Sequence, residues 1–356
     1  MPYLEKQKHH WPVDMMLRTL CIGFIFSLLI NTAIAQVKVL QSGFIFDEAP
    51  FKACHASTLV ELSNHQLMSA WFAGSNEGNK DVCIWIATKQ GKKWSKPRMV
   101  ADGVQNDTLR YPCWNPVLFK AKNGLLFLHY KVGPNPRTWW AEVKTSKDNG
   151  QTWSKSKKLP KGFLGPIKNK PIQLKNGAIL YPSSTESLDE KTWHIHLEKS
   201  DQNGGNLKKI AIDCGNFGVI QPSILQYPDG RLQLLCRSRQ NVIVSSWSTD
   251  QGQTWSKLEA LNLPNPNSGT DAVSLKNNLQ LLVYNPLNAG KDWWEGRSVL
   301  KLASSTNGLD WKDIYTLENH QQGEYSYPSI IQSSDSTIHI SYTSERKKIK
   351  YLQLKL

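Results

Sequence analysis

The feature that most constrains the fold is an eight-residue pattern that returns along the chain at nearly constant spacing. Residues 146–153 and 248–255 both read Ser-x-Asp-x-Gly-x-Thr-Trp, and both continue with Ser-Lys. A weaker copy occupies residues 304–311, and two fainter copies end at Trp94 and Leu207. The closing positions of the copies lie about 50 to 60 residues apart, which is the length of one four-stranded propeller blade.

The residue types in the pattern predict a hairpin turn. An Asp side chain accepts hydrogen bonds from nearby backbone N–H groups, and Gly tolerates the positive φ that such turns require. The Trp is large enough to fill the gap between neighbouring sheets. We therefore assign the repeated residues to the structure and not to substrate binding.

Strand-like runs fill the intervals between the repeats and form six groups of three. They are predicted at 57–62, 67–73 and 82–88; 116–120, 125–131 and 139–145; 172–174, 178–182 and 192–199; 223–226, 232–237 and 242–248; 272–275, 279–284 and 299–304; and 329–332, 337–343 and 349–354. Residues 37–46 are predicted to supply the outer strand that closes the ring and so removes a free sheet edge. The sequence thus predicts an all-β fold, a six-bladed β-propeller, with seven blades as the alternative because outer strands are hard to count.

The N-terminal residues predict an export signal. The stretch 20–35 is apolar, follows Arg18 and ends in Ala33-Ile34-Ala35, the small-x-small pattern of signal-peptidase sites. We expect a signal peptide over 1–35, cut near Ala35, and a single propeller domain over 36–356. The mature protein is then secreted or periplasmic, with no stable membrane span.

The net charge of +14 predicts a polyanionic partner. The lysines are scattered through turns and no nucleic-acid-binding motif is present, which favours an acidic polysaccharide or oligosaccharide over nucleic acid. The cysteines after residue 35 form no Cys-x-x-Cys pair, so we predict no metal site and no cofactor. We also expect a monomer.

The repeated pattern is the Asp-box, and the chain after residue 36 resembles the sialidase-like proteins with BNR repeats. The resemblance implies a site with three arginines that bind a carboxylate, an Asp acid/base, and a Tyr nucleophile activated by a Glu. Arg237 and Arg297 match the second and third arginines, and Asp81 matches the acid/base. Tyr327, or alternatively Tyr325, matches the nucleophile.

Two positions depart from the sialidase pattern. His55 stands where the first arginine is expected, and Gln221 stands where the Glu is expected. Gln cannot act as a base, whereas His titrates near neutral pH and suits that role. A base beside a carboxylate that arginines neutralise is what β-elimination from a uronic acid requires.

The chain also resembles β-propeller polysaccharide lyases and dehydratases that act on glucuronate-containing glycans, such as ulvan-type or rhamnose–glucuronate polymers. The segments that carry this resemblance are loops rich in Pro, Gly and Asn, at 54–56, 112–116, 131–137, 165–170 and 264–269. Loops on a rigid scaffold commonly carry function. We predict as catalytic residues His55, Arg137, Tyr130 and Tyr327, and as substrate-binding residues Arg237, Arg297, Asn115, Lys168, Asp271 and Asp81.

A structural role competes with each assignment. His55 can be a hydrogen-bonded core histidine, Arg137 a partner in a loop salt bridge, and the tyrosines part of the core. Lys168, Asn115 and Asp271 can cap turns. Three functions therefore compete: a lyase or dehydratase, which we favour, an exo-glycosidase of the sialidase type, and a carbohydrate-binding propeller without activity. If hydrolysis is the reaction, Asp81 becomes the acid.

Overall fold

The computed structural model describes residues 1–3, 37–62 and 66–356, and residues 4–35 of the predicted signal peptide lie outside this part of the chain. The chain divides into the units Met1–Ile34 and Ala35–Leu356, and the second unit contains every strand described. Within the described ranges the regular structure is all β, as predicted. No helix in these ranges has the length and hydrophobicity of a membrane-spanning segment.

The strands follow one another at short intervals. Their bounds are β1 (Lys38–Phe44), β2 (Ala53–Glu61), β3 (Leu67–Gly74), β4 (Cys83–Gln90), β5 (Lys93–Trp94), β6 (Arg98–Ala101), β7 (Cys113–Lys120), β8 (Leu126–Val132), β9 (Trp140–Ser146), β10 (Lys157–Lys158), β11 (Ile172–Gln173), β12 (Ile179–Glu186), β13 (Trp193–Ser200), β14 (Lys208–Ala211), β15 (Val219–Gln226), β16 (Leu232–Ser238), β17 (Val242–Ser248), β18 (Glu259–Pro264), β19 (Asp271–Ser274), β20 (Gln280–Tyr284), β21 (Val299–Ser305), β22 (Lys312–Asn319), β23 (Tyr325–Gln332), β24 (Ile338–Ser344) and β25 (Lys348–Lys355).

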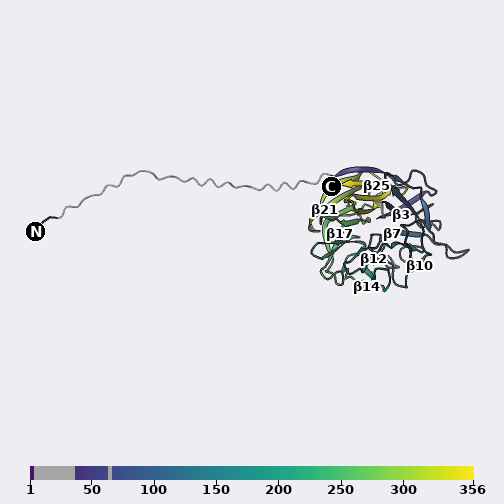
Figure 1. Cartoon of the computed structure of the whole chain (residues 1–356), viewed down its shortest axis with the longest axis horizontal. Coiled ribbons are helices and arrows are strands. Elements are labelled where there is room, and N and C mark those ends of the chain that lie inside the picture. The colour runs from purple at the N-terminus through teal and green to yellow at the C-terminus, as the bar shows by residue number, and fades with distance from the viewer. Residues whose placement is uncertain (4–36, 63–65) are drawn as a thin grey trace. The chain divides into compact units, whose positions relative to one another are not determined.

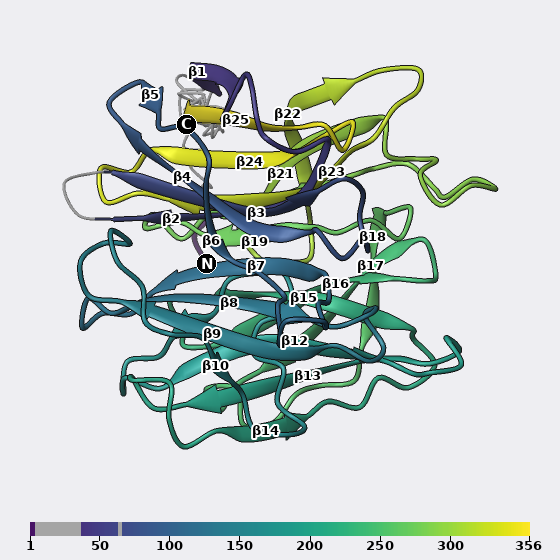
Figure 2. The same ribbon diagram turned by 90° about the vertical axis from the view of Figure 1, so that its right-hand side faces the viewer.

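These strands form six antiparallel sheets, which are the blades of a propeller. Blades one to five are β2–β6, β7–β10, β11–β14, β15–β18 and β19–β22, and they follow one another around the domain (Figure 1). The sixth blade has the order β1-β25-β24-β23, so the first strand pairs with the last, as Figure 2 shows. The six-bladed prediction is confirmed, and so is closure of the ring by the segment that starts near residue 37.

The burial of the strands explains why their apolar runs are continuous. All eight positions of β3 and all seven of β8 and β16 are buried, because each blade is covered by a neighbour on both faces. In the outer strand β22, every position is exposed or half-buried. Apolar clusters join adjacent blades, and the first of them brings Phe72 of β3 against Leu118 of β7 and Leu128 of β8.

The Asp-box turns have the structural role that the sequence predicts. The Ser146 hydroxyl accepts a bond from the Gly150 N–H at 2.8 Å, and the Asp148 carboxylate accepts the Thr152 N–H at 3.0 Å. Ser248 and Asp250 repeat this arrangement at 2.9 Å in both bonds. Gly150 has φ +81°, a conformation that Gly adopts without strain and that other residues rarely adopt.

Short polar side chains tie the innermost strands to one another. The Ser329 hydroxyl of β23 accepts the Leu59 N–H of β2 at 3.2 Å, and Thr58 of β2 accepts the Leu118 N–H of β7 at 3.3 Å. The inner strands are therefore fixed relative to one another by direct bonds between blades, and they form a rigid base for the side chains at their ends.

Candidate active site

Four innermost strands carry a β-bulge at the same place, and these bulges shape the candidate site. The pairing register shifts after His55 in β2, Trp114 in β7, Ile220 in β15 and Ser326 in β23. The next residue has a positive φ in each case; these residues are Ala56 (55°), Asn115 (37°), Gln221 (55°) and Tyr327 (52°). Positive φ is uncommon for residues other than Gly, and such strained positions cluster at functional sites.

A sequence signal for these bulges exists and was not used in the predictions. In three of the four strands the bulged residue is followed by proline, as Asn115-Pro116, Gln221-Pro222 and Tyr327-Pro328. Proline has no N–H to donate, so within a buried strand it is confined to bulges and edges. A proline at the equivalent position of three inner strands therefore indicates which face of the propeller carries the candidate site.

Tyr327 and Arg237 form the centre of the site. The Arg237 Nη1 lies 2.9 Å from the Tyr327 hydroxyl and 3.3 Å from Gln221 Oε1, while Nε donates to the Asn267 side chain at 2.9 Å. The Tyr327 side chain is half-buried and Arg237 is buried. The structure thus brings together the predicted residues Tyr327 and Arg237, and it places Gln221 beside them.

Arg297 and Arg346 add two further guanidinium groups. Arg297 Nη1 donates to Glu324 Oε1 at 3.0 Å, and Arg346 Nε donates to Glu324 Oε2 at 2.7 Å. Arg346 also pairs with Glu77 of the first blade. Burial raises the pKa of Glu324, but the hydrogen bond and charge of Arg346 and the charge of Arg297 outweigh it, so the net shift is downward. Glu324 is therefore an ionised anchor for two arginines.

Arg346 is a residue that sequence reasoning missed. It lies in the turn between β24 and β25, within a run of Lys and Arg that is typical of an exposed hairpin. Closure of the ring brings this turn to the first blade, where the charge of Arg346 acts on His55. Arg346 thus supplies a third arginine near the position where the sialidase-type arginine is replaced by His55.

His55 is fully enclosed beside Tyr327. Their ring centroids lie 4.2 Å apart, and neither ring nitrogen of His55 has a hydrogen-bond partner within the described residues. Burial lowers the pKa of His55 far below its usual value, and the charges of Arg346, Arg297, Lys168 and Arg237 lower it further. His55 is therefore neutral and belongs to the site, but it lies beneath Tyr327 and not on the open surface.

Lys168 and Gly269 line the other side of Tyr327. The Lys168 Nζ donates to Asn169 Oδ1 and to the Thr270 carbonyl, both at 2.9 Å, and it lies 5.8 Å from the centroid of the Tyr327 ring. Burial lowers the pKa of Lys168 to about 7. A Cβ at Gly269 would lie 3.2 to 3.3 Å from Lys168, Gln221 and Tyr327, so Gly269 lets three side chains meet.

Two other predicted site residues, Tyr130 and Arg137, make polar contacts with residues outside this cluster. The Tyr130 hydroxyl bonds to Glu142 at 2.9 Å and to Ser156 at 2.7 Å, and its ring packs in the core between the first two blades. Arg137 pairs with Glu190. Tyr130 thus packs in the core and Arg137 forms a salt bridge. These are the structural roles named above as alternatives to catalysis.

The predicted carboxylates also cap local structure. Asp81 accepts the Ser75 N–H at 2.7 Å and the Ser75 hydroxyl at 2.8 Å, both within its own loop. Asp271 is buried, pairs with Lys170 at 2.8 Å and accepts the Ile330 N–H at 2.9 Å, so it joins neighbouring blades. Asn115 occupies its bulge next to Trp114 and is buried. Asn115 thus occupies a bulge equivalent to that of Tyr327. The carboxylates of Asp81 and Asp271 are instead engaged in hydrogen bonds, and for Asp271 an ion pair, that stabilise the fold.

Aromatic side chains flank the arginines on two sides. The Arg237 guanidinium lies 5.7 Å from the Trp193 ring centroid, and Glu186 pairs with Trp193 in the β12–β13 register. Burial raises the pKa of the Glu186 carboxyl against the opposing charges of Arg237, Arg137 and Arg239. On the other side, Trp293 is 60% exposed and lies 5.2 Å from Arg297 and 4.6 Å from Arg346.

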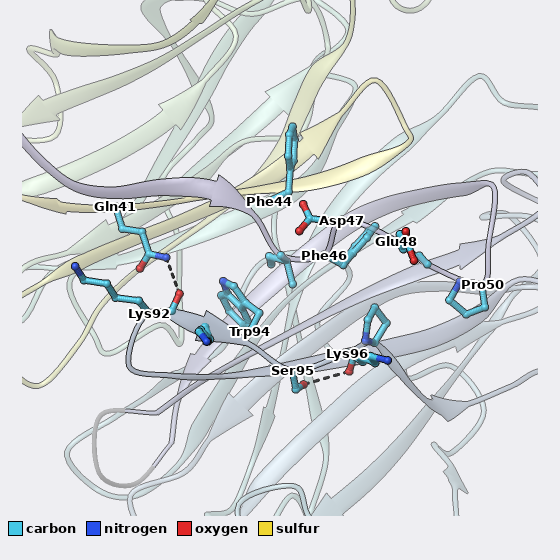
Figure 3. A pocket seen from close by; sticks show the side chains of 14 residues that line it. Gln41, Phe44, Phe46, Asp47, Glu48, Pro50, Lys92, Trp94, Ser95 and Lys96 are labelled. Atoms are coloured by element: carbon cyan, nitrogen blue, oxygen red, sulfur yellow. Dashed lines mark hydrogen bonds between the residues drawn. The ribbon is translucent and has the colours of Figure 1, made fainter.

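A cavity of about 760 Å³ lies away from these groups, between the β1–β2 connection and the β5–β6 edge of the first blade. Figure 3 shows Phe46 and Trp94 in its wall, with Asp47 and Glu48 on one side and Lys92 and Lys96 on the other. The mixed charges give it no preference for an anion, and it contains none of the predicted site residues.

Comparison with known proteins identifies the family. The BNR repeat-like domain matches residues 65–340. The anhydrosialidase of Macrobdella decora is 26% identical over 238 residues, which are 58% of this chain and 29% of that protein. The chain therefore spans under a third of the length of this relative.

Solved structures show the same fold. A protein of unknown function from Dyadobacter fermentans superposes with a TM-score of 0.72 and 16% identity, over 90% of this chain and all of that one. The NanB sialidase of Streptococcus pneumoniae gives 0.69 and 14%, over 88% of this chain and 70% of that one. From the repeats, the six blades and these matches, the chain belongs to the BNR repeat-like domain family of the sialidase superfamily.

Proposed function

We propose that this protein is an enzyme that cleaves a glycosidic bond next to a carboxylated sugar, by β-elimination at a uronic acid. The observation that carries the proposal is the Tyr327 hydroxyl 2.9 Å from Arg237, in a site where Arg297, Arg346 and Lys168 add positive charge. Arginine binds carboxylates through paired hydrogen bonds, and clustered cations stabilise the negative charge that develops in an elimination.

The groups that surround Tyr327 favour elimination over the sialidase reaction. A Tyr nucleophile needs a neighbouring carboxylate to take its proton, and the amide of Gln221 cannot do so. Glu324, a carboxylate at the arginines, is bound by Arg297 and Arg346. In the described residues no carboxylate hydrogen-bonds to the Tyr327 hydroxyl, so Tyr327 is left as the group that can exchange a proton with substrate.

The proposed reaction uses Tyr327 on one face of the sugar. The Arg237 and Arg297 side chains hold the carboxylate and thereby acidify the proton on C5. In one concerted step on that face, the Tyr327 hydroxyl gives its own proton to the leaving oxygen as the C4–O bond breaks, and the phenol oxygen takes the proton from C5. The C5–H electrons form the C4–C5 double bond, and Tyr327 ends the step as the neutral phenol with which it began. Neutral His55 beneath the ring holds Tyr327 in place, which changes the role predicted for it from base to support.

The first experiment is to incubate the protein with glucuronate-containing polysaccharides and with a sialoside, and to follow ultraviolet absorbance and released sugar. We expect absorbance near 235 nm, the signature of the unsaturated product, to rise with the glucuronate polymers. Tyr327→Phe and Arg237→Ala should each reduce turnover at least about 10²-fold. If Tyr327→Phe retains turnover within about threefold, Tyr327 is not the reacting group.

Hydrolysis or transfer of the sialidase type is the second candidate. The anhydrosialidase relative favours it, and so does Glu186, a half-buried carboxyl near Arg237 whose pKa burial raises. Release of sialic acid without a change in absorbance would establish this reaction in place of elimination. A protein that binds these glycans and changes none of them would be a carbohydrate-binding propeller.

A further inference from the structure

A second cavity lies between blades two and three, and its lining differs from that of the first. Its volume is about 670 Å³, within the range of small-molecule sites. Phe127 of β8, Tyr181 of β12 and Phe163 of the β10–β11 connection form apolar walls. Lys155 and Lys157 line it as well, both exposed, and among the described residues that line it none is acidic.

A buried histidine in this cavity has no partner. His129 is 4% exposed, and neither ring nitrogen makes a hydrogen bond with the described residues. Its ring stacks on Phe127 with centroids 5.8 Å apart and meets Tyr181 edge-on at 5.3 Å. Burial and the Lys131 charge lower its pKa to about 3, so the ring is neutral, and its two enclosed nitrogens are one donor and one acceptor.

The wall of the cavity is held in place by buried charged groups. The connection that carries Phe163 is fixed where Glu198 accepts the Leu164 and Gly165 N–H groups at 2.8 and 2.7 Å. The Lys131 Nζ donates to the Pro166 carbonyl at 2.8 Å. The cavity is therefore preformed, so a ligand would not have to order this wall on binding.

The lining combines three properties that select a ligand. Aromatic faces suit a sugar ring, lysines in a lining without acidic residues suit a carboxylate, and the polar side chains of Thr145, Ser154, Asn203 and Asn206 suit sugar hydroxyls. We propose that this cavity is a second sugar-binding site that takes a carboxylated monosaccharide unit of a glycan. It shares the ligand class of the proposed function but none of its reacting residues.

The test separates the two sites by removing one of them. In the full chain carrying Arg237→Ala, binding of glucuronate is titrated by ligand-observed NMR, with glucose as the uncharged probe. We expect glucuronate to bind still, and more tightly than glucose. Adding Lys155→Ala with Lys157→Ala should weaken glucuronate binding at least fivefold. Lys92→Ala with Lys93→Ala removes the same charge at the other cavity and should change binding less than twofold.

Three outcomes would overturn the proposal. These are loss of all glucuronate binding in the Arg237→Ala chain, equal weakening by the two lysine pairs, and equal affinity for glucose. Phe163→Ala gives a second readout, because it removes an apolar wall and keeps every charge; we expect at least a threefold loss for glucuronate. If Arg237→Ala keeps full turnover on the glycan, the proposed function fails while the binding result at this cavity still stands.

Discussion

Gln221 is the residue at which the type of reaction is decided. Its side-chain oxygen lies 3.3 Å from Arg237 Nη1, in the bulge equivalent to that of Tyr327. A carboxylate here would neutralise the arginine that we assign to the substrate, and it would also provide the base that a Tyr nucleophile needs. The two proposed reactions therefore respond to this substitution in opposite directions.

Gln221→Glu tests that difference directly. Under elimination we expect kcat/KM on the glucuronate polymer to fall at least about tenfold, because the new charge competes for Arg237. Under the sialidase-type reaction, release of sialic acid should rise instead. Gln221→Asn, which keeps the amide, serves as the control for packing. Both activities are measured on the same Gln221→Glu protein, and the activity that changes identifies the reaction. If kcat/KM is unchanged on both substrates, Gln221 does not take part in either reaction.

The resemblance to the sialidase-like proteins assigned Arg237 and Tyr327 to one site, and in the structure the Arg237 Nη1 lies 2.9 Å from the Tyr327 hydroxyl. Arg346 could not be found in this way, because its partner Glu77 is 269 residues away and meets it through ring closure. Tyr130 resembles a site residue in sequence, yet strand alternation turns it towards Glu142 in the core between the first two blades.

Each Asp-box turn is an element whose stability depends on an ionised carboxylate. Hydrogen bonds from the Thr152 side chain, the Ser146 side chain and the Thr152 backbone lower the pKa of Asp148 to about 2. The Thr254 side chain and backbone do the same for Asp250, to about 2. A carboxyl whose pKa is depressed on folding stabilises the fold above its unfolded pKa, and this contribution disappears as pH falls through the folded value.

The native protein should therefore lose stability between about pH 4 and pH 2 in part through these two turns. We expect the urea midpoint of an Asp148→Asn/Asp250→Asn chain to fall less across that range than that of the wild type. The exposed Asp107 and Asp292, changed to Asn together, provide the matched control for net charge. If the urea midpoints of the wild type and the Asp148/Asp250 variant fall equally as the pH is lowered, protonation of these two carboxyls does not cause the loss of stability.

At the scale of the whole molecule, the fold depends on one pairing that no other blade shares. Strand β1 pairs with β25 at six positions, from Lys38 with Lys355 to Phe44 with Lys350. Without β1, the sixth blade would expose a long strand edge that can pair with other chains. The blade count and this closure were predictable, because both follow from the spacing of the repeats and the need to cover edges.

Removal of β1 measures the contribution of this closure. A chain that begins at residue 45 should be less stable by roughly 3–9 kcal/mol, if each of the six paired positions contributes about 0.5–1.5 kcal/mol. We expect a lower thermal midpoint and concentration-dependent association, measured by calorimetry and by light scattering. A synthetic peptide with the sequence of residues 37–45 should restore part of the loss. An unchanged midpoint would mean that the other three strands of the blade suffice.

The four bulges also have an evolutionary consequence. Because residues 56, 115, 221 and 327 already adopt a positive φ at equivalent bulges, a change of one codon there can replace a side chain of the candidate site on the same strand pairing. Duplication of a blade copies the turn together with its strand. New reactions can then arise in this lineage by exchanging single side chains on an inherited backbone, and the present set of Ala, Asn, Gln and Tyr is one combination among many.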